Sequence, residues 1–324
     1  MPMAGTQNSK NGSGEAEVDV LGLGNSCLDQ IFALGAFPRP GASMPVKRVT
    51  AAPGGQAAST LVGCQRLGLT TRFVLRTGDD AAGARQVEAL THEGVDLTLA
   101  RTIPGVPSAA AYILLNETRG QRTVIWNTDP RLAVAAEDLP PGAMARAKLL
   151  YIDGKDGPAC LAVSRQARAL GRPVVSDIDT PQPWTRDLIA SVSDCICSRE
   201  FLAAFFDGAD VEPALRRLAA QGPHLVCATL GDAGALAFES GRWHRSPAFP
   251  VAVVDDTGAG DAFRAGYIYA LLAGWSVEDR LRFANATAAC ACGAVGAVAS
   301  MPRRGDVVAM LRRFQLTGPW ELAP

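Results

Sequence analysis

One carboxylate stands where a glycine-rich turn leads into an apolar helix. The segment Gly258-Ala259-Gly260-Asp261 opens a helix-periodic stretch that runs to Gly274. Such a turn leaves the first N–H groups of the helix unpaired, and the positive end of the helix dipole adds to them, so the turn is a ready anion site. Asp261 would lie beside that anion, where a carboxylate can accept a proton from an attacking hydroxyl. The pattern indicates phosphoryl transfer to an alcohol.

A plainer interpretation of this segment is a glycine-rich helix entry in which Asp261 only stabilises the helix N-terminus. The longer run 254–266 argues against it, because it closely resembles the C-terminal signature of the ribokinase-like (PfkB-type) sugar kinases. Asp256 replaces the usual first threonine of that signature, and Arg264 stands in a variable slot.

A second resemblance lies far upstream. Gly54-Gly55 at the start of a small-residue helix, Leu67-Gly68 at its end and the segment 77–83 resemble the N-terminal signature of the same family. The combined match covers roughly residues 18–315. It implies an α/β fold with a mostly parallel sheet sandwiched by helices, and a small discontinuous β lid. The pattern is closest to the ketohexokinase and sulfofructose kinase branch.

The resemblance also implies a mechanism for the first segment. Asp261 is expected to be the general base, and the backbone N–H groups of Gly258, Ala259 and Gly260 to stabilise charge on the transferring phosphoryl group. The expected reaction is ATP-dependent phosphorylation of a sugar hydroxyl, with a ketose-like or anionic sugar favoured. The alternatives are a nucleoside or vitamin kinase of the same fold, and a catalytically silent protein that binds a sugar or nucleotide as a regulator.

The expected substrate residues follow a strand or open a helix. Asp29 matches a position whose carboxylate binds sugar hydroxyls in the family, and glycines let the backbone approach a ligand closely. Ser59 stands where many members carry asparagine. Lys155 is expected to meet an anionic group of the substrate, although a solvated surface lysine is an equal alternative. The expected set is Asn25, Asp29, Gly54, Gly55, Gln56, Ser59 and Lys155.

A third group of residues is expected on the nucleotide side. These are Thr229, Gly231 and Gly234 in a loop after a strand, and Asn285 near the adenine. Mg²⁺ is expected to be held mainly by ATP and water, because Leu202 occupies the slot of the family's usual glutamate; Glu200 is the candidate substitute. Asp255 and Thr257 are candidate carbonyl ligands for K⁺, as in some relatives.

Short apolar strands and helical stretches alternate along the rest of the chain, which predicts right-handed crossovers and a parallel sheet. Two regions, about 30–52 and 108–127, alternate apolar and polar residues instead, which predicts β-hairpins. The resemblance implies that these strands form the lid and a homodimer contact. Residues 1–17 are small and polar and are expected to be a disordered tail, with 18–315 as the kinase domain and 316–324 as a C-terminal tail.

Composition excludes several other classes. The chain has 324 residues and a net charge of −1, which gives no bulk attraction to nucleic acid or to a membrane surface. With no apolar h-region at the start and no run long enough for a bilayer, we expect a cytoplasmic protein. Cysteines spaced Cys-x-Cys suit neither zinc nor redox chemistry. Gly22-x-Gly24 lacks the third glycine of a dinucleotide fingerprint.

Overall fold

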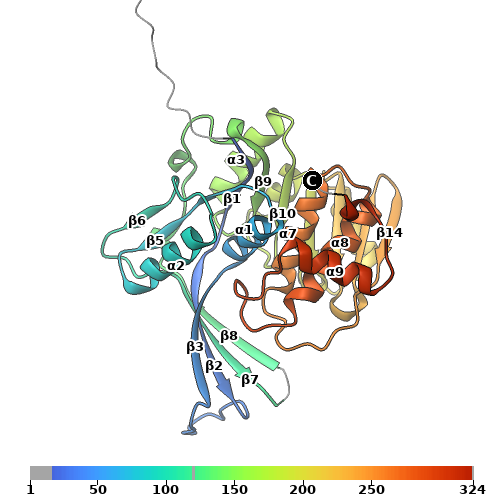
Figure 1. Cartoon of the computed structure of the whole chain (residues 1–324). Helices are drawn as coiled ribbons and strands as arrows, with labels where there is room; N and C mark the ends of the chain where they lie inside the picture. Colours follow the sequence, from blue (N-terminus) through green and yellow to red (C-terminus); the bar gives the residue numbers. More distant parts are fainter. Residues whose placement is uncertain (1–16, 119–120, 323–324) are drawn as a thin grey trace, which may run out of the picture.

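The computed structural model describes residues 17–118 and 121–322, so the tail expected at 1–17 lies, except for Glu17, outside the described residues. An eight-stranded sheet forms the centre, in the order β14-β13-β12-β11-β10-β9-β1-β4 (Figure 1). The strands from β4 to β12 are parallel, and β13 is antiparallel to both neighbours. Their bounds are β1 Val18–Leu23, β4 Thr71–Val74, β9 Ala147–Ile152, β10 Val174–Asp177, β11 Asp194–Ser198, β12 Leu225–Thr229, β13 Ala235–Glu239 and β14 Arg242–Ser246.

Helices cover both faces of this sheet, because strands made of nearly continuous apolar runs must be buried on both sides. One apolar cluster is shared by the sheet with α1 (Gln56–Leu67), α2 (Ala81–His92), α7 (Ala259–Leu272), α8 (Val277–Ala291) and α9 (Arg304–Arg313). The other is shared with α3 (Gly157–Ala169), α4 (Thr185–Ser191), α5 (Arg199–Phe205) and α6 (Val211–Ala219). The expected α/β sandwich is confirmed.

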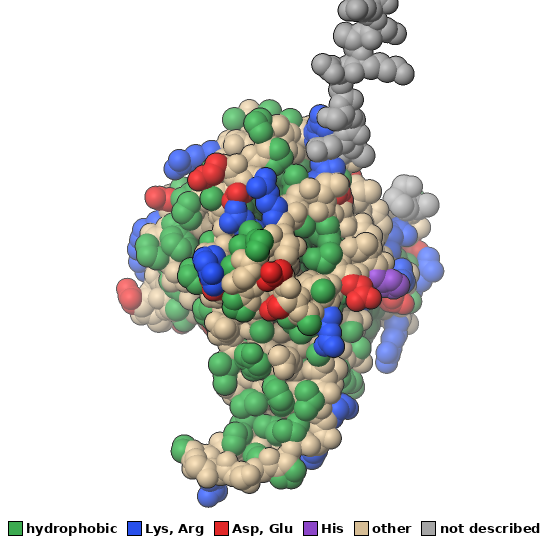
Figure 2. Space-filling model, turned by 90° about the vertical axis from the view of Figure 1, so that its left-hand side faces the viewer, with side chains coloured by type: hydrophobic (Ala, Val, Ile, Leu, Met, Phe, Trp, Pro, Cys, Tyr) green, Lys and Arg blue, Asp and Glu red, His purple; other side chains and the backbone are tan. Residues whose placement is uncertain are grey.

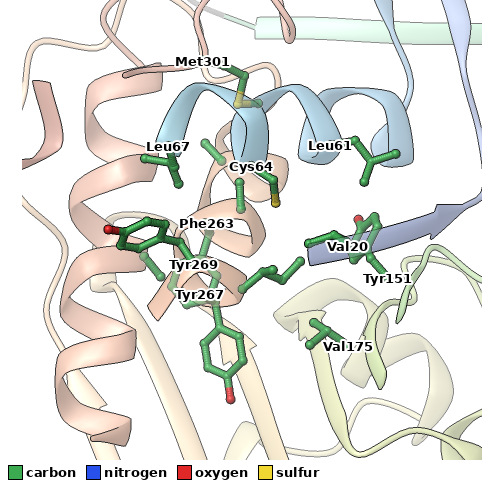
Figure 3. Close-up of a cluster of buried hydrophobic side chains, with 14 of the residues drawn as sticks. Val20, Leu61, Cys64, Leu67, Tyr151, Val175, Phe263, Tyr267, Tyr269 and Met301 are labelled. Atoms are coloured by element: carbon green, nitrogen blue, oxygen red, sulfur yellow. The ribbon is translucent and has the colours of Figure 1, made fainter. Parts of the chain in front are cut away.

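The packing of α1 against α7 forms the centre of the first cluster. Figure 3 shows Leu61, Cys64 and Leu67 of α1 pointing toward Phe263 of α7 and the strands beneath. All eight cysteines are free, and six of them are buried. Among the described residues, none of the helices has the length and apolar character needed to cross a bilayer.

The lid is a separate four-stranded sheet in the order β3-β2-β7-β8. Its strands are β2 (Cys27–Leu34), β3 (Arg48–Gly54), β7 (Ala110–Asn116) and β8 (Gln121–Asn127), and they extend below the body in Figure 1. The pairs β2/β3 and β7/β8 are antiparallel, and β2 joins β7 in parallel. A smaller pair, β5 (Arg76–Gly78) with β6 (Arg101–Ile103), lies beside α2.

Both faces of the lid expose hydrophobic side chains, since Val124 and Trp126 share the face of Asp29 and Arg122. Hydrophobic side chains gather on the lid surface in Figure 2. The register places Val49, Tyr112 and Ile125 on one face, and all three are exposed. We call this the outer face of the lid. The opposite, inner face carries Asp29 and Arg122, and Arg122 forms an ion pair with Asp256 just before α7. The lid therefore contacts the loop that leads into the glycine-rich turn.

The segment expected to be a C-terminal tail packs on the domain. Residues Pro319–Glu321 form a short 3-10 helix, and the Trp320 side chain is completely buried. Trp275 packs edge-on against it, with ring centroids 6.1 Å apart, and Arg304 Nη2 donates to the Trp320 carbonyl at 2.9 Å. A single large aromatic side chain thus anchors the end of the chain to α8 and α9.

We expect Trp320→Ala to lower the free energy of unfolding by about 3–5 kcal/mol, the usual cost of truncating a buried tryptophan. Leu322→Ala is the matched control: it lies two residues further on, its side chain is 73% exposed, and its change should stay within about 0.5 kcal/mol. Urea unfolding of both variants measures the difference. Equal stabilities would contradict the packing of this segment.

Candidate active site

Parallel strands bring several polar residues to one edge of the sheet, because their carboxyl ends meet there. Asn25 follows β1, Asp153 follows β9 and Asp177 ends β10, and these three strands are neighbours in the sheet. The N-terminus of α7, with Asp261 in its first turn, reaches the same edge, since Arg264 one turn further along α7 pairs with Asp177. The residues expected at a phosphoryl-transfer site are brought together by the fold.

The turn into α7 has the geometry expected of an anion site. Gly258 is the N-cap residue with φ of 82°, a left-handed conformation that favours glycine. A Cβ atom on Gly258 would lie 2.8 Å from the Cα of Ala297, so the loop around residue 297 packs directly on the turn. The Ala259 N–H donates to the Asp256 carbonyl at 3.2 Å, whereas Gly260 lies in the first turn, where the helix supplies no acceptor.

The environment of Asp261 suits a proton acceptor. The residue is partly buried, and burial raises the pKa of its carboxyl group well above the usual value. The negative charge of Asp177 raises the pKa further, as do Asp29 and Asp153, and the positive charge of Arg264 opposes them. A carboxylate with a raised pKa binds a proton more strongly, which favours general-base catalysis as long as the group is ionised.

Asp255 ties together the two loops beside this turn. Its buried carboxylate accepts from the Thr257 N–H and from the Gly296 N–H, both at 2.9 Å. The side chain therefore holds the loop shape, which leaves backbone carbonyls as the only groups that Asp255 and Thr257 could offer a cation. The potassium site stays a prediction.

Asp29 lies on the inner face of the lid, where β2 meets the body. It is 5% exposed and accepts from the Cys27 thiol at 3.1 Å, and burial raises its pKa. Gly54, paired with Cys27 at the end of β3, has no room for a side chain because a Cβ there would overlap the Asp29 carboxylate. Asp29 and Gly54, both expected at the substrate, are thus in contact with each other.

Asn25 and Lys155 share Asp153 as a hydrogen-bond partner. The Asp153 carboxylate accepts from the backbone N–H of Asn25 at 2.5 Å and of Lys155 at 3.0 Å. Burial raises the pKa of Asp153 to about 7. The Lys155 Nζ forms an ion pair with Asp179 at 3.0 Å, so its charge is already balanced. Its expected role toward an anionic substrate stays a prediction.

The start of α1 holds the other expected substrate residues. Gly55 is its N-cap and Gln56 its first residue, and the Asn25 carbonyl accepts from Ala58 N–H at 3.2 Å. Ser59 is completely buried, and its hydroxyl has no partner in the described part of the chain. The α1 N-terminus is therefore held against the end of β1, and Ser59 faces the interior.

The nucleotide-side residues form the loops after β12 and β14. Gly231 begins a short 3-10 helix that Gly234 ends as its C-cap, and the Leu230 N–H donates to the Gly234 carbonyl at 2.7 Å. Asn285 is buried on α8, and its Nδ2 donates to the Ser246 carbonyl and hydroxyl, each at 3.0 Å. Asn285 thus shapes the loop after β14, and its contact with adenine stays a prediction.

The candidate magnesium residue is exposed. Glu200 lies in the first turn of α5, while Leu202 is fully buried in the second apolar cluster. Within the residues that the structure describes, no group of three or more His, Cys, Asp or Glu side chains could hold a metal ion. The expectation that magnesium is held mainly by ATP and water stays a prediction.

Sequence reasoning missed a buried polar network directly behind Asp261. Arg264 pairs with Asp177 at 2.6 Å, Tyr151 Oη donates to Asp177 at 3.5 Å, and Thr60 Oγ1 donates to Tyr151 at 3.0 Å. All four side chains are buried. The available signal was Arg264 itself, a charged residue inside an otherwise apolar helix.

The packing of the turn gives a stability prediction. Gly258→Ala should lower the free energy of unfolding more than Gly274→Ala does. Both glycines have positive φ, which costs an alanine about 1–2 kcal/mol, but only the Cβ at Gly258 meets the backbone of Ala297. Urea unfolding of the two variants measures the difference, and equal losses would mean that the loop around Ala297 does not rest on the turn.

Known proteins resemble the chain over nearly its whole length. The model of the family described as pfkB family carbohydrate kinase matches residues 18–304. The chain is 27% identical to a nucleoside kinase of Methanothermobacter thermautotrophicus over 94% of the chain and 98% of that protein. It is 31% identical to a fructokinase of Klebsiella pneumoniae over 80% of the chain and 92% of that protein.

A solved structure has the same fold. The ribokinase of Arabidopsis thaliana complexed with ribose and ATP superposes with a TM-score of 0.78 at 25% identity, covering 91% of this chain and 99% of that one. The family model matches far more than half of the chain and includes both the lid and the α7 turn. The protein therefore belongs to the pfkB family of carbohydrate kinases, phosphotransferases that move a phosphoryl group from ATP to a sugar or nucleoside.

Proposed function

We propose that the protein phosphorylates one hydroxyl of a sugar or nucleoside with Asp261 as the general base. The observation that carries this proposal is the position of a carboxylate with a raised pKa in the first turn of α7, beside the free N–H groups of an anion-binding helix N-terminus. The names of relatives, which include nucleoside kinase, ribokinase and fructokinase, support the substrate class.

In the proposed reaction the substrate hydroxyl lies between Asp261 and the γ-phosphate of Mg·ATP. Asp261 accepts the hydroxyl proton as the oxygen attacks phosphorus, and ADP leaves. The N–H groups of the first turn of α7 stabilise the charge on the transferring group. The lid, which contacts the turn through Arg122 and Asp256, excludes water as a competing acceptor.

The charges around the site favour a neutral, polyhydroxylated substrate. Asp29, Asp153 and Asp177 surround Asp261, and Lys155, the expected partner for an anionic group, is paired with Asp179. Carboxylates accept hydrogen bonds from hydroxyl groups but repel a second anion. A neutral ketose, aldose or nucleoside therefore fits better than a sugar acid or sulfo-sugar, and Lys155 remains the residue that would admit the latter.

The test is an ADP-release screen with Mg·ATP against neutral ketoses and aldoses, sugar acids, phospho- and sulfo-sugars and nucleosides. We expect turnover on neutral substrates. Running each with and without K⁺ tests the carbonyl site of Asp255 and Thr257. ATP binding without turnover on any substrate would indicate a silent regulator and overturn the proposal.

With the accepted substrate, Asp261→Asn should lower kcat by about 10²–10⁴-fold, the usual loss for a missing general base. Asp279→Asn, which makes the same change in the first turn of α8, is the control and should leave kcat unchanged. Thermal shift with Mg·ATP checks that both variants fold and bind nucleotide. Full turnover by Asp261→Asn would refute the role of Asp261.

We also propose that the outer face of the lid pairs with a second copy of the chain. Val49 and Ile125 lie on this face and are 59% and 56% exposed, and such an apolar surface is typical of an interface. The double variant Val49→Glu/Ile125→Glu should sediment as a monomer and the wild type as a dimer. Leu170→Glu, at an exposed leucine beyond α3, is the control and should sediment like the wild type. A wild-type monomer would contradict the proposal.

A further inference from the structure

Arg264 is a buried cation on a helix whose neighbouring residues are apolar, so side-chain packing does not explain its charge. It lies one helical turn after Asp261 on α7, its side chain is 5% exposed, and Asp177 beside it is 3% exposed. Replacing a buried ion pair by apolar side chains is often neutral or stabilising, because removing two charges from water is costly. Its Nε atom also has no partner among the described residues, which adds to that cost.

The polar contacts of Arg264 connect the first turn of α7 with two strands of the sheet. Nη1 donates to the Gly260 carbonyl at 2.9 Å, and Nη2 donates to the Ile196 carbonyl at 3.3 Å and pairs with Asp177 at 2.6 Å. The guanidinium therefore joins α7 to the end of β10 and to the middle of β11. A planar group with several fixed donors can do this, whereas a single ammonium group cannot reach all three partners.

A second path closes on the same turn from the other side. Asp177 accepts from Tyr151, Tyr151 accepts from Thr60 of α1, and Thr60 Oγ1 lies 3.5 Å from the Asp261 carbonyl oxygen. The chain of contacts thus begins at the carbonyl of Gly260 and returns at the carbonyl of Asp261. Four separate elements fix the backbone that carries the proposed base.

The charge of Arg264 also bears on Asp261. The ionisable groups that face Asp261 are Asp177 on β10, Arg264 on α7, Asp29 and Cys27 on β2, Asp153 after β9 and Tyr151 on β9. Burial and the carboxylates among them raise the pKa of Asp261, while the charge of Arg264 lowers it. Arg264 is the one cation in this set. Without its charge, the Asp261 carboxyl group would stay protonated up to a higher pH.

We propose that Arg264, held in place by Asp177, is a positioning residue that fixes the first turn of α7 and keeps the Asp261 carboxylate ionised. The inference rests on the proposed function, because it assigns Arg264 and Asp177 a role through Asp261. Two separable effects follow. The positive charge sets the pH at which Asp261 ionises, and the fork of hydrogen bonds sets where Asp261 stands.

The first test measures the ionisation of Asp261 without any substrate. Protein labelled with ¹³C at the aspartate carboxyl groups is titrated by NMR, and the Asp261 signal is the one missing from Asp261→Asn. Arg264→Met should move its titration to higher pH because a neighbouring positive charge is lost. Asp177→Asn should move it to lower pH because a negative charge is lost. A purely structural role does not predict shifts of opposite sign.

Three further variants complete the titration. The double variant Arg264→Met/Asp177→Asn removes both charges, so its Asp261 carboxyl group should titrate close to that of the wild type. It replaces Arg264→Met if that single variant does not fold. Arg264→Lys keeps the charge and should also titrate close to the wild type. Arg72→Met is the matched control. Arg72 lies on edge strand β4, its side chain is 3% exposed and it pairs with Asp96, and its removal should not move the Asp261 signal. An unchanged Asp261 titration in both Arg264→Met and Asp177→Asn overturns the proposal.

The second test uses the substrate found in the ADP-release screen and measures kcat against pH. Arg264→Met should move the acid limb of the profile to higher pH, and Arg264→Lys should leave the limb in place but lower kcat by about 10²-fold, since the base is displaced. Full kcat in Arg264→Lys would overturn the positioning role. If no substrate is turned over, the NMR result still decides the charge role, so a failure of the proposed function and a failure of this inference are distinguishable.

Discussion

The structure depends most on how the first turn of α7 is held. In the proposed reaction this turn offers free N–H groups, such as that of Gly260, to an anion, and no side chain caps it. Its support comes from outside instead: Asp255 ties the preceding loop to Gly296, Ala297 packs on Gly258, and Arg264 binds the Gly260 carbonyl.

Charge is the second constraint at the same edge of the sheet. The fold gathers Asp29, Asp153, Asp177 and Asp261, and burial penalises the ionised form of each. Such a cluster binds hydroxyl groups and protons well, but it would lose the ionised base without a compensating cation. Arg264 supplies that cation and pairs with Asp177.

The lid brings residues from distant parts of the chain to the loop before α7. β2 carries Asp29 on its inner face, and β8, almost 100 residues later, carries Arg122 on the same face beside Asp256. Asp256 stands where the family signature usually has threonine, so this departure has a structural partner in the lid. The resemblance located both signatures, but the partner of Asp256 became visible only when the two segments were folded side by side.

The sequence by itself determined the fold class, the family and the place of the proposed base. The fold class and the place of the base follow from local patterns: buried strands alternating with helices, and a glycine turn that leads into an apolar helix with a carboxylate in its first turn. The family follows from the resemblance of the two signatures. Tertiary structure decided which polar residues meet. Asp177, Tyr151 and Thr60 lie far from Arg264 in the chain, Lys155 finds Asp179, and Trp320 turns an expected tail into part of the core. Such partners depend on the order of strands and the packing of helices, which arise from long-range contacts that no short stretch of sequence contains.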